Sequence, residues 1–228
     1  MLRLAFATGT EPGKWFRRFR ENTAHGGLET LDADDALATL LDGGADLALA
    51  RVPARGDERI DGSFHVVRLY AEAPGVAVPK DSVYAEVGED VRAEDVADEY
   101  LNYRIPNSGL VDVEAVRAGL QVVGANVGIV IAPRPLLKVL SKKQVVPLGL
   151  VDAEVPRTEI CLVWRKCRDA DDIQDFVGVA KGRTTNSSRQ KKPKRSAREK
   201  AKAKQARRAA ARSLPKSKKS SDRHKRRK

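Results

Sequence analysis

The sequence predicts an α/β fold in which helices cover a parallel sheet, followed by a disordered basic tail. Strand-like apolar runs alternate with amphipathic helical runs as far as Arg51. The connections between these runs are short, as in sheets built of consecutive parallel units. After Lys181 the composition changes, and from Arg189 onward the chain has no aromatic residue.

The first strand and helix are predicted from residues 2–22. Apolar and other residues alternate over 2–7, which is the period of a strand. Pro12 suits the first turn of a helix, because its missing N–H would have no helical partner there. Trp15, Phe16 and Phe19 then share one helical face, and Gly26–Gly27 ends the segment.

The next strand, helix and strand are predicted over residues 28–51. Strands are expected at 28–31 and 46–51, and a helix between them carries an apolar face that starts at Ala36. Asp34 or Asp32 is expected to cap this helix, because a carboxylate accepts hydrogen bonds from free N–H groups of the first turn. Gly43–Gly44 ends it.

The remaining elements are assigned by the same periodicities. Further strands are expected at 66–70, 75–79, 127–131, 145–150 and 159–164. Helical segments are expected at 94–98, 113–122, 135–140 and 171–180. Cys161 alternates with apolar residues in the last strand, so we expect it to be a small core residue rather than a redox group.

Charge divides the chain into an acidic body and a basic tail. Residues 189–228 contain 20 Lys and Arg and two acids, a net charge of +18, whereas the remainder has 23 basic and 29 acidic residues, a net charge of −6. Such a tail is typical of an arm that binds polyanions, and without aromatic residues it cannot stack on bases. We expect sequence-independent binding to nucleic acid; a solubilising role and binding to acidic proteins or anionic lipid are the alternatives.

The basic side chains expected to contact phosphates are spread along the whole tail. They are Lys191, Lys192, Lys194, Arg195, Arg198, Lys202, Lys204, Arg207, Arg208, Arg212, Lys216, Lys218, Lys219, Arg226 and Arg227.

Catalytic, metal and membrane motifs are not found. There is no nucleophile elbow, no Cys/His pair at motif spacing, and no Gly-rich dinucleotide fingerprint, so we expect no enzyme and no cofactor. The two cysteines and three histidines have no metal-ligand spacing. No apolar run reaches the roughly 18 residues needed to span a bilayer, and no signal peptide is evident, which predicts a cytoplasmic protein.

The order of several segments resembles the effector-binding domain of LysR-type transcriptional regulators. The segments are LRLAFATGT, LLDGGADLALARVP, VVRLYAEAPGVAVPKDS, VEAVRAGLQVVGANVGIVIAPRPLL and QVVPLGLVDAEVPRTEICLVWRK. The closing GRTTNSSR with a basic tail resembles short actinobacterial forms. The resemblance implies a periplasmic-binding-protein type 2 fold with two Rossmann-like lobes, a small anionic effector in the cleft, transcriptional or nucleoid-linked regulation, and a homodimer.

The resemblance also predicts the division into lobes. Residues 1–74 and 146–184 are expected to form the first lobe, 75–145 the second, and 185–228 the disordered tail. The family's N-terminal helix-turn-helix has no counterpart here, so operator recognition is not carried over, and the second lobe is expected to be trimmed between 98 and 113. A ligand-free scaffold that binds RNA, a ribosome or an acidic protein through the tail is the alternative function.

Seven residues are candidates for the ligand site, each with a structural alternative. Thr8, Gly9 and Thr10 form a turn before a helix, where backbone N–H groups bind anions, although Thr10 could simply cap the helix. Arg51 ends the third strand, at the mouth of an open sheet, and could instead be a paired or solvated arginine. The others lie in predicted loops, where Arg104 and Asn107, with Ser108, could close on a ligand and Asn126 could instead supply a turn with positive φ.

Overall fold

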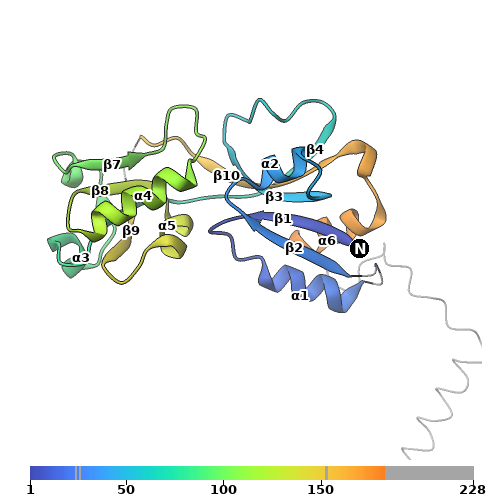
Figure 1. Ribbon diagram of the computed structural model, residues 1–228, viewed down its shortest axis with the longest axis horizontal. Helices are drawn as coiled ribbons and strands as arrows, with labels where there is room; N and C mark the ends of the chain where they lie inside the picture. Colours follow the sequence, from blue (N-terminus) through green and yellow to red (C-terminus); the bar gives the residue numbers. More distant parts are fainter. Residues whose placement is uncertain (24, 26, 152–153, 183–228) are drawn as a thin grey trace, which may run out of the picture. The chain divides into compact units, whose positions relative to one another are not determined.

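Two five-stranded mixed sheets, each covered by helices, make up the described part of the chain (Figure 1). The computed structural model describes residues 1–23, 25, 27–151 and 154–182, all within the unit Met1–Thr184. The predicted tail and all its candidate phosphate contacts therefore lie outside the described residues. None of the described helices is long and apolar enough to cross a membrane.

The first sheet has the strand order β2-β1-β3-β10-β4. Its strands are β1 (Leu2–Ala7), β2 (Leu28–Ala33), β3 (Leu47–Pro53), β4 (Phe64–Ala71) and β10 (Thr158–Arg165), and its helices are α1 (Gly13–Asn22), α2 (Ala36–Leu41), η2 (Lys166–Arg168) and α6 (Asp171–Ala180). We call this group the first lobe. The predicted parallel pairing is confirmed for β1 with β2 and β3, but β10 runs antiparallel to both β3 and β4, so the sheet is mixed.

Alternation along the strands determines which helix covers which face of this sheet. Leucines of β1 and β3 point to one face, where they pack with Phe16 and Phe19 of α1 and Phe176 of α6. Alanines at the intervening positions point to the other face and pack against α2. Small residues let the backbone of a helix approach a sheet closely, so the short helix α2 lies on the alanine face. Cys161 is buried on this face, as expected.

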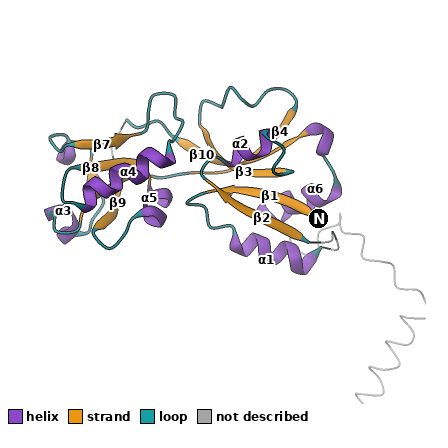
Figure 2. Cartoon of the chain, viewed as in Figure 1, coloured by secondary structure: helices purple, strands orange, loops and turns teal. Residues whose placement is uncertain are grey.

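The second sheet has the order β6-β9-β5-β8-β7. Its strands are β5 (Pro74–Pro79), β6 (Val91–Arg92), β7 (Leu101–Arg104), β8 (Ile129–Pro133) and β9 (Val145–Val151), and its helices are α3 (Val83–Val87), η1 (Glu94–Val96), α4 (Val113–Gly124) and α5 (Arg134–Leu140). We call this group the second lobe. Figure 2 shows the alternation of strands and helices in both groups. The region expected to be trimmed contains β7.

The boundary expected at residue 146 is wrong. β9 pairs along its length with β5, placing Val76 opposite Leu148, so this strand belongs to the second sheet. The chain returns to the first sheet only at Thr158, the first residue of β10. Periodicity identified the strand, but it cannot tell which sheet an apolar strand joins.

The helix caps also differ from the expectation. Asp35, rather than Asp34 or Asp32, caps α2 by accepting a hydrogen bond from the Ala38 N–H at 3.0 Å. The N-cap of α1 is Pro12, with no side-chain cap, and the Thr10 hydroxyl instead donates to the carbonyl of Ala7 at 2.7 Å.

Candidate functional site

The structure brings three of the predicted ligand residues together at the end of β1. Arg51 donates a hydrogen bond from Nη2 to the carbonyl of Thr8 at 3.0 Å. Gly9 has φ +90°, and a Cβ built on it would lie 2.8 Å from the Cα of Leu136, which belongs to α5 of the second lobe. Glycine is therefore required here both by the backbone conformation and by the close approach of the second lobe.

The polar groups of this turn are already bonded within the chain. The Thr8 N–H donates to the carbonyl of Ala33 and the Thr10 N–H to that of Ala7, both at 3.0 Å. The Thr8 hydroxyl lies 2.6 Å from a carboxylate oxygen of Asp32 and 2.9 Å from one of Asp34. These N–H groups and this hydroxyl are therefore not free to bind an anion.

Arg51 forms a buried ion pair with Glu72. Its Nε and Nη2 donate to the two carboxylate oxygens at 2.7 and 3.0 Å, and the side chains are only 5% and 1% exposed. Thr158 of β10 donates its hydroxyl to the same carboxylate at 2.8 Å. The structure thus shows the alternative of a paired arginine, although β3 continues beyond Arg51 to Pro53. The ion pair lies where the chain leaves the first sheet and where it returns, because Glu72 follows β4 and Thr158 begins β10.

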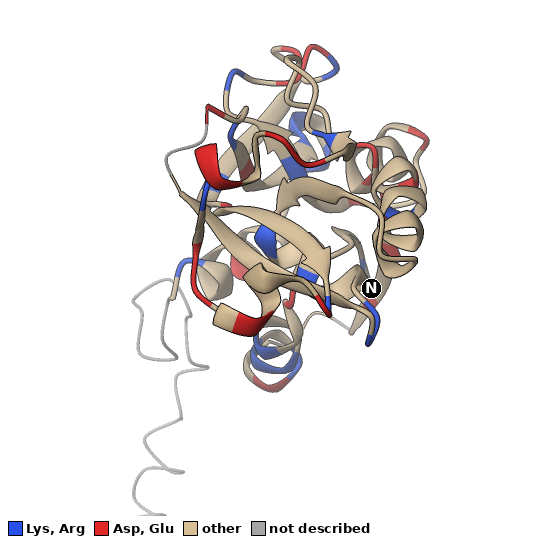
Figure 3. Ribbon diagram, turned by 90° about the vertical axis from the view of Figure 1, so that its left-hand side faces the viewer, with Lys and Arg blue, Asp and Glu red and all other residues tan. Residues whose placement is uncertain are grey.

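A second ion pair joins the two lobes directly. Both terminal nitrogens of Arg117, on α4, donate hydrogen bonds to the carboxylate of Asp34, and Nη2 lies 2.8 Å from Oδ1. The Arg117 guanidinium holds the pKa of Asp34 below its usual range, and the Thr8 hydroxyl acts in the same direction. Opposite charges therefore face one another across the lobes; acidic and basic side chains are interspersed over the described body (Figure 3).

A pocket of about 330 Å³ lies beside Gly9 and takes residues from both lobes. It is lined by Gly9, Glu11, Tyr70, Ala73, Arg134, Pro135 and Lys138. Two cations and one acid therefore lie around it. Burial raises the pKa of Tyr70, so its phenol remains a hydrogen-bond donor at neutral pH.

One cation of this pocket, Arg134, is only partly paired. Its Nη1 lies 3.3 Å from a carboxylate oxygen of Asp90, but its Nε is buried and has no hydrogen-bond partner among the described residues. An unpaired buried donor costs about 1–3 kcal/mol, so an acceptor placed there would be favourable. Sequence reasoning missed Arg134 and Lys138, although their position just after a strand was a usable signal.

The other predicted residues lie elsewhere. Arg104 donates from Nη2 to the carbonyl of Glu154 at 2.7 Å. Asn107 and Ser108 line a separate pocket of about 430 Å³ together with 53–55 and 154–157. Asn126 lies between α4 and β8 with φ 67°, which agrees with the expected turn role.

The buried cysteine and the possible metal ligands are placed as follows. Burial raises the pKa of the Cys161 thiol to about 11, so it stays protonated, in keeping with a core role. Within the described ranges, no group of three or more His, Cys, Asp or Glu residues is placed to hold a metal ion.

No protein-family model and no curated protein matches the sequence. Solved structures do. Full-length CbnR complexed with its target DNA matches with a TM-score of 0.57 at 15% identity, over 80% of this chain and 69% of that one. The effector-binding domain of a BenM variant matches with a TM-score of 0.58 at 16% identity, over 79% of this chain and 93% of that one.

A putative LysR-family transcriptional regulator from Pseudomonas aeruginosa matches with a TM-score of 0.56 at 16% identity, over 79% of this chain and 70% of that one. The described chain therefore has the fold of the effector-binding regulatory domains of LysR-family regulators, as the resemblance implied. At these identities the comparisons establish the fold.

Proposed function

We propose that this chain is a non-enzymatic regulatory module of the cytoplasm, which binds a small anionic effector between its lobes and attaches to nucleic acid through its basic tail. The observation that carries the effector site is a pocket lined by both lobes, whose residue Arg134 has a buried Nε without a partner in the described part of the chain. The fold supports the same function, because similar structures include the effector-binding domain of a BenM variant.

The chemistry of the pocket favours a carboxylate. A carboxylate oxygen would accept from the Arg134 Nε, and hydrogen bonds to charged groups contribute about 1.5–3 kcal/mol. Lys138 supplies a second positive charge, and the Tyr70 hydroxyl supplies a neutral donor. Glu11 lies on the same pocket and opposes ligands of high negative charge.

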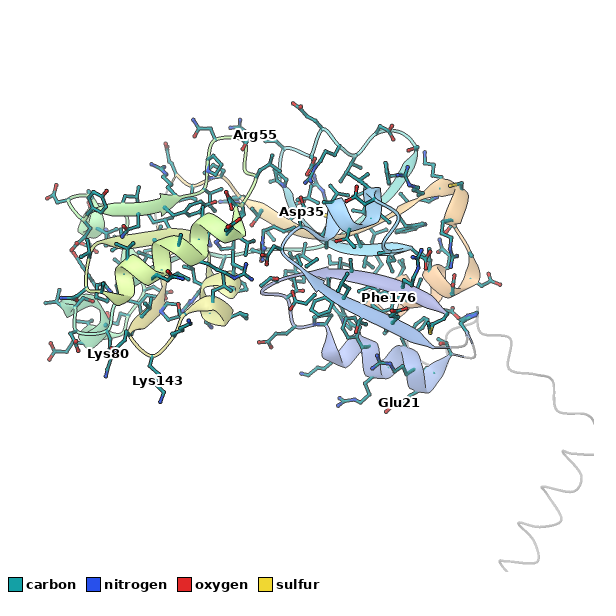
Figure 4. The ribbon with its side chains drawn as sticks, in the orientation of Figure 1. Glu21, Asp35, Arg55, Lys80, Lys143 and Phe176 are labelled. Carbon is teal, nitrogen blue, oxygen red and sulfur yellow. The ribbon has the colours of Figure 1, made fainter. Side chains whose placement is uncertain are left out.

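Calorimetric titration of the full chain with acetate, succinate and citrate tests this site. We expect the best binder to weaken by about tenfold or more in Arg134→Ala and Lys138→Ala, because each removes a cation from the pocket. Lys143→Ala is the control, because Lys143 projects from the loop that precedes β9 and does not line the pocket (Figure 4). Equal binding by all four proteins would reject the effector site.

The tail supports the nucleic-acid part of the proposal by its composition. Its 20 cations in 40 residues would release counterions from duplex DNA, and each neutralised phosphate adds about 0.9 to the log–log salt slope. Anisotropy titrations of a duplex and a scrambled duplex at two salt concentrations, with the full chain and a 1–188 truncation, test it. We expect tight, salt-sensitive and sequence-independent binding by the full chain only. Equal binding by both proteins would remove the tail from the proposal.

A ligand-free scaffold is the second candidate function. It is favoured because two arginines near the contact between the lobes already have carboxylate partners within the chain: Arg51 is paired with Glu72 and Arg117 with Asp34. Such a protein would use the same tail to hold RNA, a ribosome or an acidic protein. A metabolite screen by thermal shift separates the two, because only an effector domain is stabilised by a ligand of its pocket.

We further propose that the chain forms a homodimer through its open sheet edges. β2 and β7 are edge strands, and both present exposed apolar side chains: Leu31 is 52% exposed and Leu101 is 42% exposed. Exposed apolar edges are otherwise an aggregation hazard, which pairing with another chain removes. Light scattering on the full chain should give a dimer mass, and Leu31→Lys should lower it; an unchanged mass would contradict this interface.

A further inference from the structure

A second pocket, in the second lobe, is lined by residues other than those of the proposed effector site. Its volume is about 580 Å³, well above that of the pocket beside Gly9. The lining residues are Arg117, Leu120, Gln121, Gly124, Val139, Leu140, Ser141, Lys142, Gln144 and Val145. The first four occupy one face of α4, and the others come from the end of α5, the following loop and the start of β9.

Both apolar and polar side chains line this pocket. Leu120 and Val145 are buried, whereas Val139 is 49% exposed. Ser141 carries a hydroxyl oxygen that is buried and has no hydrogen-bond partner among the described residues. A buried polar atom without a partner is costly, so a ligand atom that bonds the Ser141 hydroxyl would be stabilising.

Two cations lie on this pocket. Lys142 is exposed on the loop after α5, and Arg117 is the residue that binds Asp34 of the first lobe. A carboxylate held here would share the Arg117 guanidinium with Asp34. A ligand in the second lobe would thereby change the strength of a contact between the lobes.

We propose that this pocket is a second ligand site for a monocarboxylate with an apolar body, such as a medium-chain fatty acid. The apolar chain packs on Leu120, Leu140 and Val145, and the carboxylate lies between Lys142 and Arg117. The volume is within the range of small-molecule sites, about 300–1,000 Å³. The proposal is independent of the effector site, because Arg134 and Lys138 do not line this pocket.

Calorimetric titration of the full chain with octanoate, and with octanamide as its uncharged match, tests the site. We expect octanoate to bind more tightly than octanamide and to weaken about three- to fivefold in Lys142→Ala, the size of a partly exposed charge pair. Lys143→Ala is the matched control, because its side chain projects outward from the same loop (Figure 4). Equal weakening in both variants, or none in Lys142→Ala, would overturn the proposal.

Three further variants locate the binding. A Cβ on Gly124 would lie 3.7 Å from Val145 and 3.9 Å from Gln144, so Gly124→Leu fills the pocket and should abolish octanoate binding. Asp34→Asn frees Arg117 and should tighten binding about two- to fivefold. Arg134→Ala should leave octanoate binding unchanged; if it weakens binding, octanoate occupies the effector site and the second site is rejected. Should Gly124→Leu fail to fold, the lysine pair still decides the outcome.

Discussion

The guanidinium of Arg117 and the carboxylate of Asp34 form an ion pair between the two lobes, with Nη2 and Oδ1 2.8 Å apart. The two side chains are 42% and 45% exposed, so solvent screens the attraction. The pair therefore contributes little to the free energy of unfolding. Because Asp34 and Arg117 belong to different lobes, whether they are paired depends on how the lobes are arranged.

Replacing Asp34 by Asn should lower the melting temperature by about 2–4 °C at most, because a partly exposed pair contributes no more than about 1 kcal/mol. The difference should disappear at about 1 M salt, where screening is strong. Differential scanning calorimetry at low and high salt measures it. Glu94→Gln, which removes an exposed pair within the second lobe, is the control and should have a smaller effect. A salt-independent loss would contradict an electrostatic origin.

Replacing Gly9 by Ala should destabilise the chain by about 2 kcal/mol or more. Alanine is strained at positive φ, and its Cβ would meet the backbone of Leu136. Gly13→Ala is the matched control, because nothing lies within 4 Å of a Cβ there and alanine favours the helix. Urea denaturation compares the two; equal stability would show that the second lobe moves aside without cost.

Replacing Glu72 by Ala should cost about 3–5 kcal/mol, because it leaves the Arg51 guanidinium buried without its carboxylate. The double variant Arg51→Met with Glu72→Met should recover most of the loss, since apolar side chains of similar size fill the space without a buried charge. Urea denaturation of both variants gives the two free energies. A double variant as unstable as the single one would assign the loss to packing.

Acid should destabilise the first lobe through Asp57. Hydrogen bonds from Arg59 lower the pKa of Asp57, whose side chain is 2% exposed. A lowered folded-state pKa adds stability that is complete above the unfolded value of about 3.9 and is lost as the pH falls through the lower folded value. Wild type should therefore lose its advantage over Asp57→Asn progressively as the pH falls below about 4. Urea denaturation across this range measures it, with the exposed Asp98→Asn as control; a constant difference would exclude Asp57.

The strands and their buried faces were predictable because successive side chains of a strand point to opposite faces of the sheet. The alternation of leucine and alanine in β1 and β3 appears in the sequence and is what separates α1 and α6 from α2. Asn126 was likewise predictable, because few other residues tolerate positive φ. Strand direction was not: β10 has the same periodicity whether it runs parallel or antiparallel to β3.

The candidate site was predicted in part, and the failures concern pairing over long distances. Arg51 was expected to end its strand, but β3 continues to Pro53, and the partner Glu72 is set by how the chain leaves the first sheet. Asp35 rather than Asp34 became the helix cap because capping depends on the backbone angles of one residue among three nearby aspartates. Arg134 was overlooked because its unpaired nitrogen is visible only in the folded chain.

The position of β10 in the first sheet imposes an order on folding during synthesis. β10 lies between β3 and β4, yet the whole second lobe precedes it in the sequence. As the ribosome extends the chain, β4 has no neighbour in its sheet until residue 165 has emerged, whereas the second sheet is complete at Val151. The second lobe can thus fold first. Until β10 is made, the nascent first lobe keeps an unpaired strand edge to which a chaperone can bind.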